Sequence, residues 1–150
     1  MPRTLVTLLI IFAAASCAPN EPGSPLATPG ITVTGAVNGT VTAVGGTACN
    51  VVKGNGSSVM GGIGIRGTMD SVAYDVAVWP DEVRVDQRTG PADAVVPTRW
   101  WATQTGAPGI TSFVKGRGAT INADLIETTE TGAPIPGGSN VRVSGQLVSC

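Results

Sequence analysis

The sequence predicts an all-β fold, either an antiparallel β-sandwich or a partly closed barrel, in a single domain over residues 31–150. Three observations support this prediction. The chain of 150 residues contains 21 glycines and 11 prolines, the two residue types least compatible with helices. Apolar and polar residues alternate with a period of two in several short segments, as in half-buried strands. Turn residues separate these segments too closely for the helical crossovers of a parallel sheet.

The first alternating segment begins at Ile31 and places apolar residues on one face: Ile31, Val33, Val37, Val41 and Ala43. Asn38-Gly39 is a strong hairpin signal within it. A two-residue turn there would pair Val37 with Thr40 and mix apolar with polar side chains on one face. We therefore expect one long strand, with room for a bulge, instead of a hairpin.

The remaining strands follow from the same alternation, and no segment shows convincing helical periodicity. We expect them at residues 61–69, 71–79, 82–87, 98–104, 118–127 and 140–149, separated by turns at 54–58, 89–91, 106–109 and 131–138. Gly62, Gly64 and Gly67 have the spacing of a dinucleotide-binding fingerprint. The residues that follow alternate as a strand and open no helix, so we expect these glycines at bulges or close strand contacts.

The N-terminus has the pattern of an export signal. Residues 1–16 combine a positive Arg3, an apolar run and a zone of small residues. The run is too short to span a bilayer. The stretch Ala-Ala-Ser-Cys resembles a bacterial lipobox, which predicts lipidation of Cys17 and anchoring to a membrane. The alternative is ordinary secretion after cleavage behind Ala15.

Residues 17–30 form the predicted boundary between anchor and domain. They contain four prolines and almost no charge, so we expect an extended tether with a reach of ~3 Å per residue. Once Cys17 carries lipid, Cys49 and Cys150 remain to pair, as expected for an exported protein. Such a disulfide would close a loop of roughly 100 residues and contribute about 4–5 kcal/mol. The alternative is two unpaired buried thiols.

Composition excludes several functions. The chain has no histidine, which removes the commonest metal ligand and the usual Ser-His and Cys-His nucleophile pairs. The formal net charge is −1 and lysines and arginines are not clustered, so we expect no nucleic-acid partner. We also predict no cofactor, no metal and no catalytic residue. Two carboxylates could act as general acid and base, but the spacing of those in one region does not place any two of them across a substrate. They are Asp70, Asp75, Asp81, Glu82 and Asp86.

Trp100 and Trp101 are the best candidates for a ligand surface. Adjacent residues of a strand point to opposite faces, so one ring belongs in the core while the other is free to contact a glycan, a lipid or a protein. The simpler alternative is that both rings only pack. The sequence does not fix which ring is buried.

The C-terminal segment from Gly116 to Cys150 resembles the end of small actinobacterial envelope lipoproteins, including the LpqH-like mycobacterial lipoprotein antigen family. In these proteins a strand rich in glycine and threonine leads to one cysteine, and a last strand carries its partner. The matching positions here are Cys49 after VTAVGGTA, Cys150 after VRVSGQLVS, and Cys17 at the lipobox. The resemblance implies a lipidated, disulfide-closed, immunogenic surface domain without known catalysis.

These observations predict a non-enzymatic lipoprotein on the outer, extracytoplasmic face of the cell membrane, acting as a surface antigen or binding module. The alternatives are a carboxylate-dependent enzyme acting on an envelope glycan and a carrier that holds lipid between its sheets. A filled core favours the binding module, and an apolar cavity favours the carrier. Two carboxylates facing each other in a cleft favour the enzyme.

Overall fold

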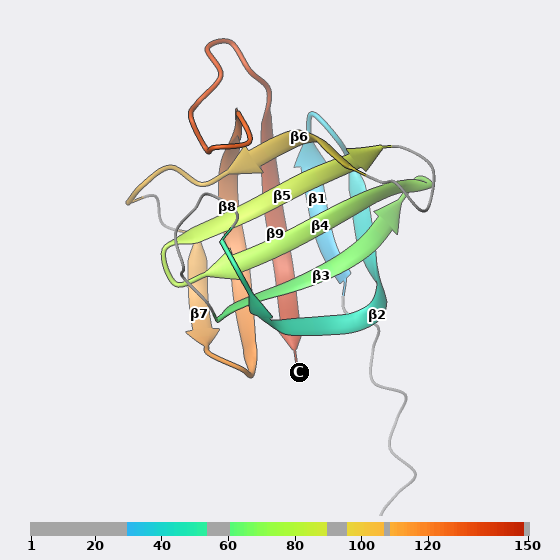
Figure 1. Cartoon of the computed structure of the whole chain (residues 1–150), viewed down its shortest axis with the longest axis vertical. Helices are drawn as coiled ribbons and strands as arrows, with labels where there is room; N and C mark the ends of the chain where they lie inside the picture. The colour runs from blue at the N-terminus through green and yellow to red at the C-terminus, as the bar shows by residue number, and fades with distance from the viewer. Residues whose placement is uncertain (1–29, 54–60, 90–95, 107–108, 149–150) are drawn as a thin grey trace, which may run out of the picture.

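A computed structural model of the chain describes residues 30–53, 61–89, 96–106 and 109–148 (Figure 1). These residues form nine antiparallel strands in one sheet, without a helix among them. The all-β, single-domain prediction is therefore confirmed. The strands are β1 (Gly30–Gly35), β2 (Gly39–Val51), β3 (Gly62–Met69), β4 (Val72–Trp79), β5 (Glu82–Thr89), β6 (Val96–Ala102), β7 (Ile110–Val114), β8 (Gly118–Thr128) and β9 (Asn140–Val148).

The sheet closes into a ring. Its strand order is β6-β5-β4-β3-β2-β1-β9-β8-β7, and β6 also pairs with β8 through Trp100–Thr128, Trp101–Glu127 and Ala102–Ile126. Figure 1 shows two layers, in which β3, β4, β5 and β6 cross in front of β1, β9, β8 and β7. The architecture thus combines the layering of a sandwich with the closure of a barrel.

Strand β2 carries the chain from one layer to the other (Figure 1). It is 13 residues long and its pairing with β3 shifts between Ala43 and Thr47. Gly45 and Gly46 lie in this interval with φ of +87° and +90°. Only glycine adopts such angles without steric cost, so the Gly-Gly pair allows the strand to bend.

The interior of the ring is a packed apolar core. Inward-facing residues of alternate positions interlock there, including Ile31, Ile63, Val85, Trp101 and Leu125, each with 0% of its surface exposed. A side chain with no exposed surface borders no space that a water molecule enters. The ring therefore encloses a solid core at these positions.

The expectation of one long strand from Ile31 is wrong, because β1 and β2 form a hairpin. The side chain of Asn38 closes the turn by accepting a hydrogen bond from Gly35 N and donating one to Gly35 O, both 3.0 Å long. The connection is longer than the two-residue turn that the sequence argument considered. Ile31 therefore pairs with Val41, and both apolar residues face the core.

Strand β7 was not predicted, whereas the other expected strands agree with the structure to within about two residues at each end. Its pairing with β8 shifts between Ile110 and Ser112, so Ile110 and Phe113 both pack against the core although they are three residues apart. This bulge hides the period of two. Within β3, a Cβ atom at Gly62 would overlap the Trp79 ring, in line with the expected close strand contacts.

Residues 1–29 and 149–150 lie outside the described part of the chain. The predicted signal peptide, the lipidation site Cys17, almost all of the tether and Cys150 fall there. The expected turn at 54–58 also lies outside the described residues, as do parts of those at 89–91 and 106–109.

Candidate functional site

The two adjacent tryptophans point to opposite sides of the sheet. Trp101 pairs with Val85, faces the core and has 0% of its surface exposed. Trp100 pairs with Asp86 on the outer side of the sheet and is half-buried. Trp100 is therefore the ring that a ligand can reach, and Trp101 is the core ring.

Strand register places Trp100 at the end of a charged row. Across β3, β4, β5 and β6, Arg66 is opposite Asp75, Asp75 is opposite Asp86, and Asp86 is opposite Trp100. Two carboxylates directly opposite each other on neighbouring strands repel. The sequence pattern puts both on the solvent side of their strands, so the repulsion needs compensation from nearby cations.

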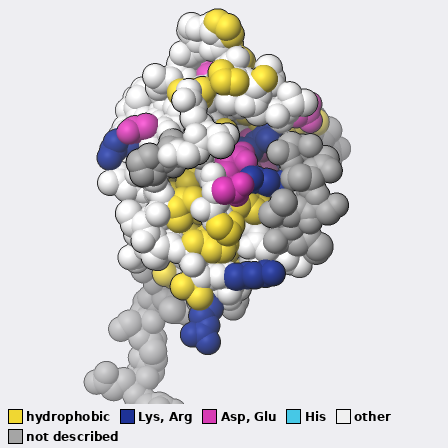
Figure 2. All heavy atoms as spheres, turned by 90° about the vertical axis from the view of Figure 1, so that its left-hand side faces the viewer, with side chains coloured by type: hydrophobic (Ala, Val, Ile, Leu, Met, Phe, Trp, Pro, Cys, Tyr) yellow, Lys and Arg dark blue, Asp and Glu magenta, His cyan; other side chains and the backbone are white. Residues whose placement is uncertain are grey.

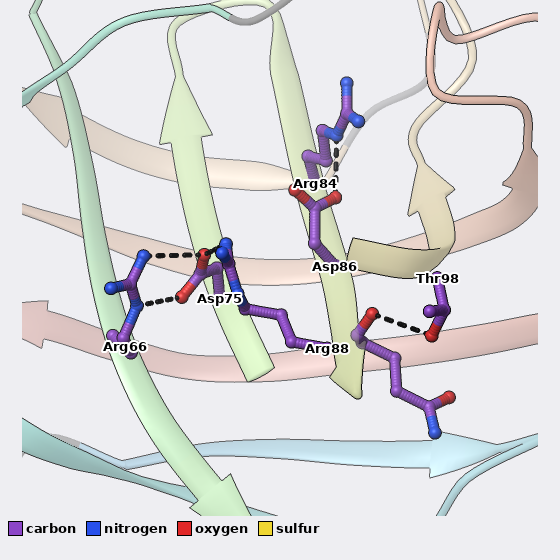
Figure 3. Close-up of polar contacts among 7 residues, drawn as sticks. Arg66, Asp75, Arg84, Asp86, Arg88 and Thr98 are labelled. Carbon is purple, nitrogen blue, oxygen red and sulfur yellow. Dashed lines mark hydrogen bonds and ion pairs between the residues drawn. The ribbon is translucent and has the colours of Figure 1, made fainter. Parts of the chain in front are cut away.

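Arginines supply this compensation (Figure 3). Arg66 holds Asp75 with two hydrogen bonds, 2.8 Å from Nε and 3.2 Å from Nη2. Arg88 donates to the same carboxylate, and Arg84 Nε lies 2.7 Å from Asp86 Oδ1. We refer to Arg66, Asp75, Arg84, Asp86 and Arg88 as the outer row.

The outer row is partly withdrawn from water. The side chain of Asp86 is 20% exposed and that of Arg84 is 13% exposed, whereas Arg66 is 66% exposed. Burial raises the pKa of Asp86 above its ordinary value; the hydrogen bond from Arg84 opposes this shift and the charge of Asp75 adds to it. A carboxyl group whose pKa is shifted by burial beside specific charged partners is typical of functional sites.

The row lies in a groove on the outside of the ring. One hollow of about 280 Å³ contains Trp100, and a second of about 440 Å³ extends to the bend of β2. The two hollows adjoin, since Val51, Asp75 and Ala77 line both of them. Together we call them the outer groove, with Val51, Asp75, Ala77, Arg84, Asp86 and Trp100 along its course.

A second arginine–carboxylate cluster lies where β6 closes on β8. Arg99 donates to both oxygens of Glu127 at 2.7 and 3.1 Å, and Ser139 Oγ lies 2.7 Å from both Arg99 Nη2 and Glu127 Oε2. Trp101 Nε1 donates to Ser139 Oγ at 3.2 Å, and the Arg99 guanidinium lies 4.7 Å from the Trp101 ring centroid. We call Arg99, Trp101, Glu127 and Ser139 the seam cluster.

The electrostatics of the seam cluster favour a charged carboxylate. Hydrogen bonds from Arg99 and from the side chain and backbone of Ser139 lower the pKa of Glu127 to about 2. The sequence analysis missed this cluster. Its only sequence signal is that alternation along β8 puts Glu127 on the inward face with Leu125, where an acid requires a partner.

The other carboxylates considered from sequence lie elsewhere. Asp81 and Glu82 are at the β4–β5 turn, where Lys53 Nζ contacts them at 3.0 and 2.8 Å. Asp70 occupies the β3–β4 turn. Asp75 and Asp86 are thus the two that the register places opposite each other. The described residues contain no group of three or more side chains suited to hold a metal ion.

Cys49 is disulfide-bonded. The two other cysteines of the chain, Cys17 and Cys150, lie outside the described residues, so the pairing of Cys49 with Cys150 stays a prediction. Thr47 Oγ1 donates to the backbone oxygen of Val148 at 3.1 Å. These residues precede Cys49 and Cys150 by two positions each, which is consistent with that pairing.

Comparisons of the chain with models of protein families, with curated proteins and with solved structures found no match. The described residues form no helix with the length and apolar character needed to cross a membrane. The fold and the groove therefore define an all-β domain with an aromatic-edged outer groove that combines charged and apolar side chains.

Proposed function

We propose that the protein is a lipid-anchored envelope lipoprotein whose domain binds an envelope glycan in the outer groove without transforming it. The observation that carries this proposal is the position of Trp100. Its ring lies on the outer face beside the outer row, while the neighbouring Trp101 supplies the core packing.

The groove offers the two kinds of contact that a sugar needs. The half-buried Trp100 presents an apolar ring face to the C–H groups of a sugar ring. Guanidinium groups carry five N–H donors each, and Arg66 uses two of them on Asp75, which leaves donors for hydroxyl groups. Ala77 and Gly64, which have small or no side chains, also line the groove.

One observation favours a carboxylate-dependent glycan hydrolase as the second candidate. Asp75 and Asp86 face each other in the groove, and burial raises the pKa of Asp86, as a general acid requires. Against this, both oxygens of Asp75 accept hydrogen bonds from arginines and Arg84 Nε donates to Asp86, so arginines already occupy carboxylate oxygens that a hydrolase needs for its substrate. Binding is therefore better supported than hydrolysis.

The lipid-carrier alternative has less support. Side chains from opposite layers of the ring, such as Ile63 and Leu125, have 0% exposed surface. A chamber for an acyl chain would give its lining measurable exposure. The inward-facing apolar side chains of the described domain thus pack against one another.

Replacement of Trp100 tests the binding proposal. The probes are immobilised muropeptides and purified envelope polysaccharides. We expect Trp100→Ala to weaken binding at least about fivefold, because stacking on an aromatic ring contributes ~1 kcal/mol or more, while Tm stays within a few degrees. Arg142→Ala is the control, since Arg142 is an exposed side chain on β9, in the other layer.

Two outcomes would contradict binding in the groove: unchanged affinity of Trp100→Ala for every glycan that the wild type binds, or no binding by the wild type. Release of reducing ends from a bound glycan, abolished by Asp86→Asn, would favour the hydrolase instead.

The anchor has its own test. Cys49 has its disulfide partner in either Cys17 or Cys150. Lipidation of Cys17 and a Cys17–Cys49 disulfide exclude each other, so intact mass and a non-reducing peptide map of membrane-extracted protein decide between them. We expect an N-terminal Cys17 with added acyl mass and a Cys49–Cys150 peptide. A Cys17–Cys49 peptide, or a soluble product that begins at Ser16, would refute lipid anchoring.

A further inference from the structure

One end of the ring carries exposed cations and exposed valines together. The turn between β7 and β8 presents Lys115 and Arg117 to solvent. Val114, at the start of the same turn, is 52% exposed. On the neighbouring strands Val148, at the end of β9, is 44% exposed, and Val44, in the bend of β2, is 67% exposed.

Strand pairing shows that these residues share one end. Gly118 of β8 pairs with Val148 of β9, and Thr47 beside the β2 bend contacts Val148. We call Val44, Val114, Lys115, Arg117 and Val148 the basal surface. In Figure 1 the β7–β8 turn, the bend of β2 and the end of β9 all lie toward the bottom.

The basal surface has a one-sided charge. The described segments that form it, residues 42–48, 110–120 and 144–148, contain no aspartate or glutamate. Figure 2 shows dark blue side chains beside yellow ones at the lower end of the described surface, with the magenta groups higher up. This end therefore attracts anions, whereas the seam cluster balances its one cation with one carboxylate and the outer row sets two carboxylates against three arginines.

The chain enters the domain at the same end. Gly30, the first residue of β1, pairs with Thr42, two residues before Val44. Ile31 pairs with Gly145 near the end of β9. The segment from residue 17 to residue 29 reaches at most about 40 Å, at ~3 Å per residue. An anchor at Cys17 would thus keep the basal surface within reach of the membrane at high local concentration.

We propose that the basal surface rests on the anionic phospholipid leaflet to which the protein is anchored, with Lys115 and Arg117 at the headgroups and the exposed valines at the interface. This inference rests on the proposed lipid anchor. The inferred contact is more than the anchor itself provides, because a tether alone would leave the domain free to rotate. Contact at this end fixes the orientation, so that the β2 end of the outer groove faces the leaflet and the Trp100 end points away from it, open to a ligand.

Hydrogen exchange of the lipidated full chain in vesicles tests this contact. The vesicles consist of phosphatidylcholine alone or of phosphatidylcholine mixed with phosphatidylglycerol. We expect slower exchange at residues 110–120 and 42–48 in the anionic vesicles only, with residues 129–139 unchanged as an internal control. Each basic side chain near an anionic leaflet contributes about a fivefold factor, so Lys115→Gln combined with Arg117→Gln should lower the equilibrium constant for contact, the ratio of protected to unprotected molecules, ~25-fold.

Arg142→Glu is the matched control, because it lowers the net charge by the same amount as the double variant but lies on an exposed site of β9. It should keep the protection at the basal surface. Equal exchange in neutral and anionic vesicles, or equal loss of protection in both variants, would overturn the proposal while leaving the anchor intact. A protein that fails to stay with the vesicles at all would contradict the anchor instead.

Discussion

The seam cluster and the outer row are built from the same side chains, arginines and carboxylates, yet they shift the pKa of a carboxyl group in opposite directions. In the seam cluster one carboxylate accepts hydrogen bonds from Arg99 and Ser139, and the pKa of Glu127 falls to about 2. In the outer row two carboxylates face each other, and burial raises the pKa of Asp86. Register and burial, more than residue type, decide whether such a cluster stabilises the fold or leaves a perturbed group at the surface.

The two tryptophans divide in the same way. Trp101 belongs to the seam cluster and joins it to the core, whereas Trp100 extends the outer row along the groove. One residue step along β6 therefore separates a structural element from the candidate binding surface.

The largest effect is expected from truncation of the core ring. Trp101→Ala should lower the free energy of unfolding by ~3–5 kcal/mol, because it leaves a cavity in the core and removes the ring from Arg99. Trp100→Ala should cost clearly less, about 1 kcal/mol, since its ring lies half-buried on the outer face and leaves no cavity in the core. Urea titrations of both variants measure the difference. Equal losses would remove the distinction between the two rings.

The second effect concerns the charge of Glu127. Because its pKa is lowered in the folded state from 4.5 to about 2, its ionisation stabilises the fold above pH 4.5, and this contribution is lost as pH falls toward 2. Arg99 is 36% exposed, so solvent screening reduces the contribution to about 2 kcal/mol. Glu127→Gln should lower stability by that amount at neutral pH and flatten the acid part of the stability profile. A parallel profile in the variant would contradict the role of the seam cluster.

A smaller loss is expected for Ser139→Ala. The hydroxyl group of Ser139 lies between Arg99, Glu127 and the indole of Trp101, and its removal deprives the last of these of its acceptor. We expect a loss of ~1–2 kcal/mol, the usual cost of leaving a buried polar group without its partner. Ser144→Ala on β9 is the control and should be nearly neutral. Denaturant midpoints measured side by side decide the point.

The sequence predicted the strands and the opposite directions of the two tryptophans because both depend on local alternation. It missed the β1–β2 hairpin because the turn is longer than two residues. It missed β7 because a bulge in that strand interrupts the alternation of apolar and polar residues. The outer row was out of reach for a related reason. Asp75 and Asp86 were both considered, but only the register of β4 with β5 places them opposite each other and brings three arginines to them.

The smallest change in stability, and the most informative sign, is expected for Asp86→Asn. Because burial raises the pKa of Asp86 in the folded state, the folded protein binds this proton more readily than the unfolded chain does. The contribution of Asp86 to stability therefore falls as pH rises from its ordinary pKa through the raised value, opposite to Glu127. Asp86→Asn removes a partly desolvated charge and also a hydrogen bond from Arg84, so the net change at neutral pH should stay within ~1 kcal/mol. We therefore compare each isosteric variant, Asp86→Asn and Glu127→Gln, with the wild type. The difference in the free energy of unfolding should change with pH in opposite directions for the two variants in the acid range. The same pH dependence in both variants would mean that the outer row stabilises the fold as the seam cluster does, with no perturbed carboxyl group available to a ligand.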